Sequence, residues 1–145
     1  MAKKRKIEYL VVHCTATLPT AEVSSILKYW RKILGWKNPG YHYIIDQSGM
    51  THQLLEEHGI ANGAQGFNHN GIHISYIGGV DRHNNSLDTR TPEQKSEMYY
   101  LLTMLMDKYR GAQLLGHCDL PGVAKDCPCF DVWDWYARHP ITLTT

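Results

Sequence analysis

The sequence lacks both a strong excess of charge and a long hydrophobic run. Its 15 Lys and Arg residues against 14 Asp and Glu residues give a formal net charge of +1, which argues against a dedicated nucleic-acid-binding protein. No stretch approaches the ~20 apolar residues of a membrane-spanning helix. The apolar run that follows the basic segment 2–6 covers only residues 9–12, which is too short for a secretion signal. We therefore expect synthesis in the reducing cytoplasm and no membrane span.

Internal repeats, low-complexity segments and linkers are also absent from the sequence. A chain of 145 residues suits one domain, because folding at this size buries roughly 68–70% of the unfolded surface and needs no disulfide bonds. The content of 43% hydrophobic and 20% charged residues is typical of a globular protein. We predict a single domain over residues 1–145, with the basic segment 2–6 as a solvated tail.

The spacing of apolar residues predicts alternating strands and helices. Strands are expected at 7–15, 41–45, 50–55, 71–77 and 113–118. Helices are expected from Pro19-Thr20 to Gly35, from Thr91 to Gly111, and over 130–138. This order predicts an α/β fold with a central mixed β-sheet flanked by helices. The glycine-rich segment 56–71 shows no periodicity, and a loop of this length in a compact domain is often functional.

Apolar positions define the predicted core faces of the two longer helices. The first helix places these residues on one face: Val23, Ile26, Leu27, Trp30, Ile33 and Leu34. The second helix begins with a capping box formed by Thr91 and Gln94, and Pro92 takes its first helical position. Its predicted core face consists of Met98, Leu101, Leu102, Leu105 and Tyr109.

Cysteine is scarce, yet three of the four cysteines lie within residues 116–130. In a reducing compartment such cysteines favour metal binding or catalysis over disulfide bonds. Neighbouring residues on a strand point to opposite faces, so His13 and Cys14 cannot both serve one centre, and neither can His117 and Cys118. If the two histidines share a face, Cys14 and Cys118 pack in the core as small apolar side chains.

Cys127 follows His117 by ten residues, in a loop that can fold back toward both histidines. Two histidines and a thiolate provide three protein ligands and leave a fourth position open, which is the pattern of a catalytic zinc site. Spacing alone leaves two alternatives: ordinary buried histidines with reduced cysteines, or a cysteine hydrolase in which Cys127 acts with His117. Cys129 has no assigned role, and we expect a reduced structural thiol there.

Several motifs occur together and in order along the chain. They are "VVHCTAT" (11–17), "GYHYIID" (40–46), "GFNHNGIHISYIGG" (66–79), "TPEQ" (91–94), "GH" (116–117) and "KDCPCFD" (125–131). Through them the chain resembles the zinc-dependent N-acetylmuramoyl-L-alanine amidases, the family shared by amidase-type phage lysozymes and peptidoglycan recognition proteins. The likeness runs from about Ile7 to Trp135. It implies the fold of that family and hydrolysis of the amide between N-acetylmuramic acid and the first L-alanine of the peptidoglycan stem peptide.

The resemblance also implies roles for particular residues. One Zn²⁺ per chain would be bound by His13, His117 and Cys127. Tyr41 matches the catalytic tyrosine of the family, and Lys125 matches its catalytic lysine. A lysine ammonium can stabilise the developing oxyanion, and zinc can activate a water molecule. The role of base is then left to Tyr41 or to the zinc-activated water itself.

Three positions in the glycine-rich segment need comment. Asn68 and His69 match the relatives' "YNHN" and are expected to line the substrate cleft, although a structural role for Asn68 in the loop is an equal alternative. Relatives commonly carry a histidine where Gly63 stands here, which puts efficiency or substrate preference in question. The histidines without a functional match are expected at the surface or in packing: His42, His52, His58, His73, His83 and His139.

The expected substrate is bacterial peptidoglycan or its muropeptides, and the protein is expected to be a monomer that reaches the wall after release. Two alternatives are a cytosolic muropeptide-recycling amidase and a non-catalytic peptidoglycan-binding protein. Cys127 disfavours both, because recycling amidases more usually have an acidic third ligand and binding proteins typically lack the ligand cysteine. Some amidase-type phage lysozymes bind RNA polymerase partly through the N-terminal segment. The short basic N-terminus here does not support that role.

Overall fold

A computed structural model describes residues 5–138. Five strands form one sheet in the order β3-β2-β4-β1-β5. Their bounds are β1 (Tyr9–Cys14), β2 (Tyr43–Ile45), β3 (Thr51–Gln53), β4 (Gly71–Tyr76) and β5 (Gln113–Gly116). The neighbours β2, β4, β1 and β5 are parallel, and β3 pairs antiparallel with β2. The predicted fold class, a mixed sheet flanked by helices, is confirmed.

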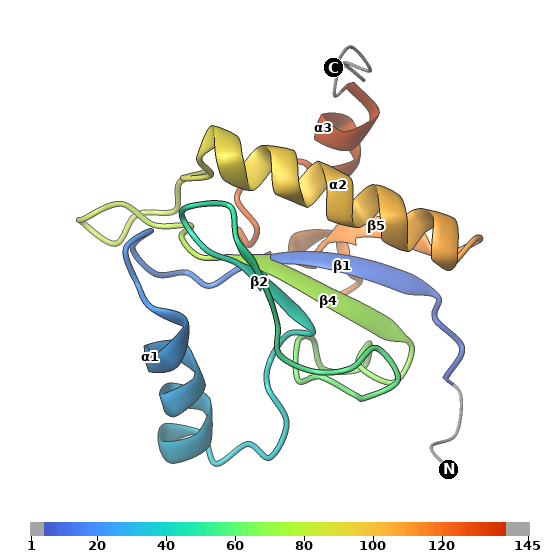
Figure 1. The fold of residues 1–145 in the computed structure, drawn as a ribbon, viewed down its shortest axis with the longest axis horizontal. Helices are drawn as coiled ribbons and strands as arrows, with labels where there is room; N and C mark the ends of the chain where they lie inside the picture. The colour runs from blue at the N-terminus through green and yellow to red at the C-terminus, as the bar shows by residue number, and fades with distance from the viewer. Residues whose placement is uncertain (1–4, 139–145) are drawn as a thin grey trace.

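The two C-terminal helices cover one face of this sheet. α2 (Pro92–Lys108) lies along the sheet, with α3 (Val132–Arg138) beyond it (Figure 1). The side chains of Leu10, Val12 and Cys14 from β1 join the core beneath these helices, as the sequence predicts for Cys14. Alternate residues of β1 therefore point toward α2, and His13 points to the opposite face.

Loops and the helical residues 23–33 cover that opposite face. Val11 of β1 packs there against Ala64 of the glycine-rich segment, and against Leu115 and Leu120 around the end of β5. Residues 54–70 contain no strand or helix, as expected. Because β1 is apolar on both faces, it lies at the centre of the fold and carries His13 to the carboxyl edge of the parallel strands.

The first helix differs from the prediction of one regular helix starting near Pro19. α1 (Val23–Lys28) is followed by a π-helical turn, η1 (Tyr29–Ile33), in which the Leu34 amide donates to the Tyr29 carbonyl (3.1 Å). A π-turn adds a residue and rotates the following side chains. The predicted core face is therefore right for Ile26 and Trp30, which are buried, and wrong for Ile33 and Leu34, which are 70% and 41% exposed.

The second helix begins as its local sequence predicts. The Thr91 side chain accepts from the Gln94 amide, and the Gln94 side chain accepts from the Thr91 amide. The Gln94 side-chain amide also donates to the carbonyls of Ile45 and Ile77 (both 3.1 Å), so the cap also fastens α2 to the sheet. Four of the five predicted core residues are buried, and the fifth, Tyr109, packs against the same core.

The strand expected over 113–118 ends early. β5 stops at Gly116, and residues His117–Asp119 form a 3₁₀ turn, η2. The Asp119 carboxylate accepts from the Gly116 amide (2.9 Å) and turns the chain. Strand alternation therefore does not apply to His117 and Cys118, and the prediction that Cys118 packs in the core is wrong: it is half-exposed. Cys129 packs against the α2-side core, and its thiol donates to the Gly79 carbonyl (3.4 Å).

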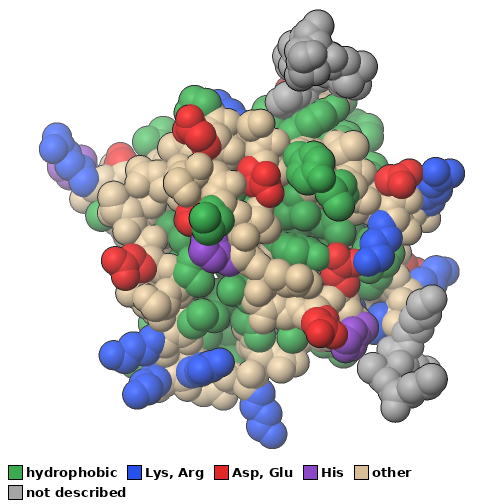
Figure 2. All heavy atoms as spheres, in the orientation of Figure 1, with side chains coloured by type: hydrophobic (Ala, Val, Ile, Leu, Met, Phe, Trp, Pro, Cys, Tyr) green, Lys and Arg blue, Asp and Glu red, His purple; other side chains and the backbone are tan. Residues whose placement is uncertain are grey.

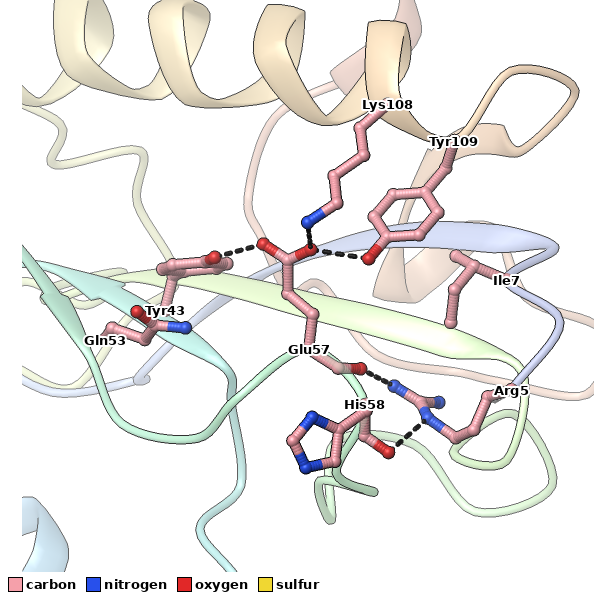
Figure 3. Close-up of a pocket in the computed structure, with 8 residues that line it drawn as sticks. All are labelled: Arg5, Ile7, Tyr43, Gln53, Glu57, His58, Lys108 and Tyr109. Carbon is pink, nitrogen blue, oxygen red and sulfur yellow. Dashed lines mark hydrogen bonds and ion pairs between the residues drawn. The ribbon is translucent and has the colours of Figure 1, made fainter. Parts of the chain in front are cut away.

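The basic segment is not wholly a solvated tail. Arg5 crosses back over the glycine-rich segment and donates to the carbonyls of Glu57 and His58 (Figure 3). It also donates to the carbonyls of Asn68, His69 and Gly71. One guanidinium carries up to five donors in a planar fork, which suits it to this task. Residues 2–4 lie outside the described part of the chain.

Charged side chains of both signs are spread over the face drawn in Figure 2, with basic ones gathered over α1. The sequence places Lys28, Arg31 and Lys32 in this region, and all three are exposed. Among the helices in residues 5–138, none is long and apolar enough to cross a membrane.

Candidate active site and metal centre

The three predicted metal ligands meet at the carboxyl edge of the parallel strands. His13 lies near the end of β1, His117 opens η2 after β5, and Cys127 lies in the loop that follows. One possible ligand atom from each residue lies within 4.8 Å of the other two. His13 Nδ1 is 4.0 Å from Cys127 Sγ, and the His13 and His117 ring centroids are 4.7 Å apart.

Backbone contacts position the Cys127 loop. The Cys14 amide donates to Cys127 Sγ (3.1 Å), and the Cys118 amide donates to the Cys127 carbonyl (2.9 Å). The loop is thereby fastened to the residue that follows each histidine. These bonds place the sulfur beside the two imidazoles although it lies far from His13 in sequence.

Both histidines are held in the neutral form. Burial lowers the pKa of His13 well below its ordinary value, and the nearby imidazoles of His73 and His117 and the Lys125 ammonium lower it further. Burial also lowers the pKa of His117, and Lys125 adds to that shift. A neutral imidazole is the form that binds a metal ion, so this environment favours coordination over protonation.

The donor set and its spacing fit zinc. Zinc sites have Zn–N bonds of about 2.0–2.1 Å and Zn–S bonds of about 2.3 Å in tetrahedral geometry, which places ligand atoms about 3.3–3.6 Å apart. The 4.0 Å separation of His13 Nδ1 and Cys127 Sγ is wider, and all three possible ligand atoms lie within 4.8 Å of one another, so binding of zinc would draw them closer together. Two imidazoles and a thiolate are donors that zinc accepts.

A cavity of about 230 Å³ opens over this cluster. Tyr41 lies in its wall, with its ring 5.0 Å from that of His13 and its hydroxyl donating to the Cys14 carbonyl (3.2 Å). Burial raises the pKa of Tyr41, and the neighbouring Cys127 raises it further, so the phenol stays protonated. Lys125 also lines the cavity and is exposed. Both residues predicted to be catalytic therefore border the space beside the candidate ligands.

The two predicted substrate-binding residues do not line this cavity. Asn68 Oδ1 accepts from the backbone amides of Gly63 (3.0 Å) and Ala64 (2.8 Å). These bonds match the alternative expectation, in which Asn68 has a structural role in the loop. The His69 side chain is exposed. The cavity is lined instead by Trp36 and Asn62, among others, and no motif in the sequence pointed to these two residues.

Gly63 lines the cavity, and the His73 imidazole lies directly against it. A Cβ at position 63 would overlap the His73 imidazole, which reaches this place from β4. His73 is completely buried, and its Nδ1 lies 2.8 Å from His13 Nε2. It was expected at the surface or in packing and is found in contact with a candidate ligand. His139 lies outside the described residues.

Comparison with known proteins agrees with this geometry. Residues 3–130 match the N-acetylmuramoyl-L-alanine amidase family. The endolysin of Enterobacteria phage T3 is 34% identical over 138 residues, which cover 94% of this chain and 90% of that protein.

Solved structures share the fold. The Ph2119 endolysin from a Thermus scotoductus bacteriophage superposes with a TM-score of 0.79 at 24% identity, over 94% of this chain and 86% of that one. The peptidoglycan recognition protein PGRP-SA of Apis mellifera gives a TM-score of 0.73 at 18% identity, over 97% and 90%. At these identities the likeness is one of fold. The sequence match and the shared fold together show that this chain belongs to the N-acetylmuramoyl-L-alanine amidase family.

Proposed function

We propose that the chain is a zinc-dependent endolysin-type amidase that hydrolyses the bond between N-acetylmuramic acid and L-alanine in peptidoglycan. The observation that carries this proposal is the convergence of His13, His117 and Cys127 beneath a cavity that Tyr41 and Lys125 also line. Family membership supports the reaction, and the donor set supports the metal. We further propose one zinc ion per chain, a monomer, and a single domain over residues 1–145.

The candidate metal ligands come from two kinds of backbone, a strand and a loop. The two neutral imidazoles and the Cys127 sulfur would bind one zinc ion, which when bound polarises a carbonyl and activates water. His13 lies on β1, which is hydrogen-bonded to a strand on each side, whereas Cys127 belongs to a loop fastened by backbone hydrogen bonds. We propose that this loop is what completes the centre.

Tyr41 and Lys125 would act on the oxygen of the scissile amide. The raised pKa of Tyr41 favours a hydrogen-bond donor over a base, since the phenol does not lose its proton near neutral pH. Lys125 is a flexible cation at the edge of the cavity and can reach the carbonyl oxygen where negative charge develops. Donors aimed at a developing oxyanion commonly contribute about 10²–10³-fold in rate.

The proposed site of action is the bacterial cell wall. The endolysin relatives and the shared fold of the peptidoglycan recognition proteins support a peptidoglycan substrate. The cavity of about 230 Å³ accommodates the amide and its immediate substituents, and longer parts of the polymer would extend over the surrounding surface. Synthesis in the cytoplasm followed by release to the wall remains our proposal.

The test measures metal content and cleavage in Cys127→Ala, with Cys118→Ala as the matched control. Wild type should contain one zinc per chain and release new L-alanine amino termini from purified peptidoglycan, and a chelator should abolish the release. Cys127→Ala should lose the zinc and at least about 10³-fold in rate, because activation of water is lost. Cys118→Ala should keep both, since its half-exposed thiol lies outside the ligand cluster.

Two results would contradict the proposal. A metal-free wild type that still cuts, and that ignores the chelator, would indicate a cysteine hydrolase acting through Cys127. A zinc-loaded wild type that retains peptidoglycan without releasing amino termini would indicate a binding protein.

A further inference from the structure

The buried His73 side chain contacts His13, one of the three candidate metal ligands. The β1–β4 register pairs Val11 with His73 and His13 with Ser75. His73 therefore lies on the same face of the sheet as His13, two positions earlier on the neighbouring strand. From there its Nδ1 meets His13 Nε2 at 2.8 Å. The other His13 nitrogen, Nδ1, is the one that lies near Cys127 Sγ.

The protons on this pair can be assigned by chemistry. A histidine that binds a metal through Nδ1 must carry its proton on Nε2, because the metal takes the Nδ1 lone pair. The Nε2–H of His13 then donates to His73 Nδ1, and the remaining proton of His73 lies on its own Nε2. Ligand histidines nearly always donate their second N–H to an acceptor that sets the tautomer and the ring orientation.

From this geometry we infer that His73 is a positioning residue for the metal centre, accepting a hydrogen bond from His13 Nε2 and keeping His13 Nδ1 turned toward Cys127. The inference rests on the proposed zinc site. An uncharged acceptor distinguishes this arrangement from one built on a carboxylate, because it orients His13 without adding negative charge beside the ligands.

Two observations argue against a purely packing role for His73. Its imidazole is completely buried, with the Phe67 backbone beside it, and an apolar side chain would fill the same space without burying two ring nitrogens. In addition, Gly63 leaves the room that the imidazole occupies. Gly63 is not among the positive-φ glycines, so its backbone conformation does not require glycine.

The experiment compares His73→Leu, which removes the acceptor, with His73→Asn, whose side-chain oxygen can replace Nδ1 as the acceptor. Zinc Kd is measured by competition with a chelating fluorophore at constant pH, and thermal unfolding of the metal-free proteins reports folding separately. We expect His73→Leu to weaken zinc binding about 10- to 100-fold and His73→Asn to stay within about threefold of wild type. Equal Kd values for the two variants would overturn the inference.

A measurement on unaltered protein covers the case in which the variants do not fold. In zinc-loaded wild type with ¹⁵N-labelled histidine, His13 Nε2 should carry a proton and show a coupling to His73 Nδ1 across the hydrogen bond. A proton on His73 Nδ1 would overturn the inference. If the wild-type protein binds no zinc, both the proposed function and the positioning role of His73 fail. If the wild-type protein binds zinc and the His73 variants bind it equally tightly, only the positioning role fails.

Discussion

Polar clusters lie at opposite ends of the parallel strands, and the larger cavity is not the one with the candidate chemistry. The amino-end cavity measures about 820 Å³, against about 230 Å³ for the carboxyl-end cavity. At the amino end the Glu57 carboxylate accepts from three donors: Tyr43, Lys108 and Tyr109 (Figure 3). At the carboxyl end, the possible metal-ligand atoms of His13, His117 and Cys127 lie within 4.8 Å of one another.

This difference shows what separates a structural cluster from a candidate site. Glu57 and Lys108 satisfy each other and, together with Arg5, fasten the glycine-rich segment to α2 and to the chain before β1. The three candidate ligands at the other end instead bring two imidazoles, whose lowered pKa keeps them neutral, close to the Cys127 sulfur, so that all three could bind one cation. The gathering of three possible metal ligands, rather than cavity volume, marks the candidate functional end.

After removal of the candidate ligand Cys127, the largest expected effect comes from a pair of lysines, one at each end of the strands. Lys125→Met should lower the rate of peptidoglycan cleavage by about 10²–10³-fold while zinc content stays at wild-type level, because oxyanion stabilisation is lost. Lys108→Met should leave the rate within about twofold and lower the melting temperature, because Glu57 loses its ion pair (2.8 Å). Similar losses of rate in both variants would remove the distinction between the two ends.

The next largest effect on the rate is expected from the first of two tyrosine variants, one at each end of the strands. Tyr41→Phe should lower kcat by about a hundredfold through loss of a donor, with zinc Kd unchanged. Tyr43→Phe removes only the hydrogen bond to Glu57 and should cost about 1–2 kcal/mol of unfolding free energy without changing kcat. Steady-state kinetics and urea unfolding measure the two quantities. A kcat loss in Tyr43→Phe that matched the loss in Tyr41→Phe would contradict the assignment.

The smallest effect concerns pH and Glu57. Burial raises the pKa of Glu57, but the donors Lys108, Tyr109 and Tyr43 outweigh burial, and the net pKa is lowered. A carboxyl group with a lowered folded-state pKa stabilises the protein above its unfolded pKa of about 4.3, and this stability is lost as pH falls through the folded value. Glu57→Gln should therefore lower the melting temperature more at pH 7 than at pH 3.5.

The neighbouring Glu56→Gln is the control for that experiment, because Glu56 is an exposed residue that pairs with the exposed His58 (3.2 Å). Its melting temperature should differ little from wild type at either pH. A Glu57→Gln difference that does not depend on pH would show that its hydrogen bonds do not require the charge.

Sequence reasoning succeeded where the structural cause is local or where several motifs occur together. The start of α2 was predictable because Thr91, Pro92 and Gln94 act on the same helix turn. Candidate ligands were identified from the ordered motifs that also indicated the family, since spacing alone left a cysteine hydrolase open. The roles of Tyr41 and Lys125 remain predictions, supported by their places around the cavity.

Errors arose where contacts between distant residues decide the outcome. The π-turn after Lys28 exposes Ile33 and Leu34, and apolar spacing cannot show a change of helix phase. The Asp119 side chain ends β5 before His117, which made strand alternation the wrong guide for Cys118. Arg5 looked like part of a tail because the carbonyls it binds lie more than fifty residues away.

By itself, the sequence determined the order of strands and helices, the start of α2 and the chemical types gathered in the ordered motifs, because caps, periodicity and motifs depend on neighbouring residues. Only the tertiary structure decided that His73 takes the space of a side chain at Gly63 beside His13, and that Glu57 accepts from three donors while His13, His117 and Cys127 gather as possible metal ligands. Those outcomes depend on strand register and on loops folding over the sheet, which bring together atoms about sixty or more residues apart.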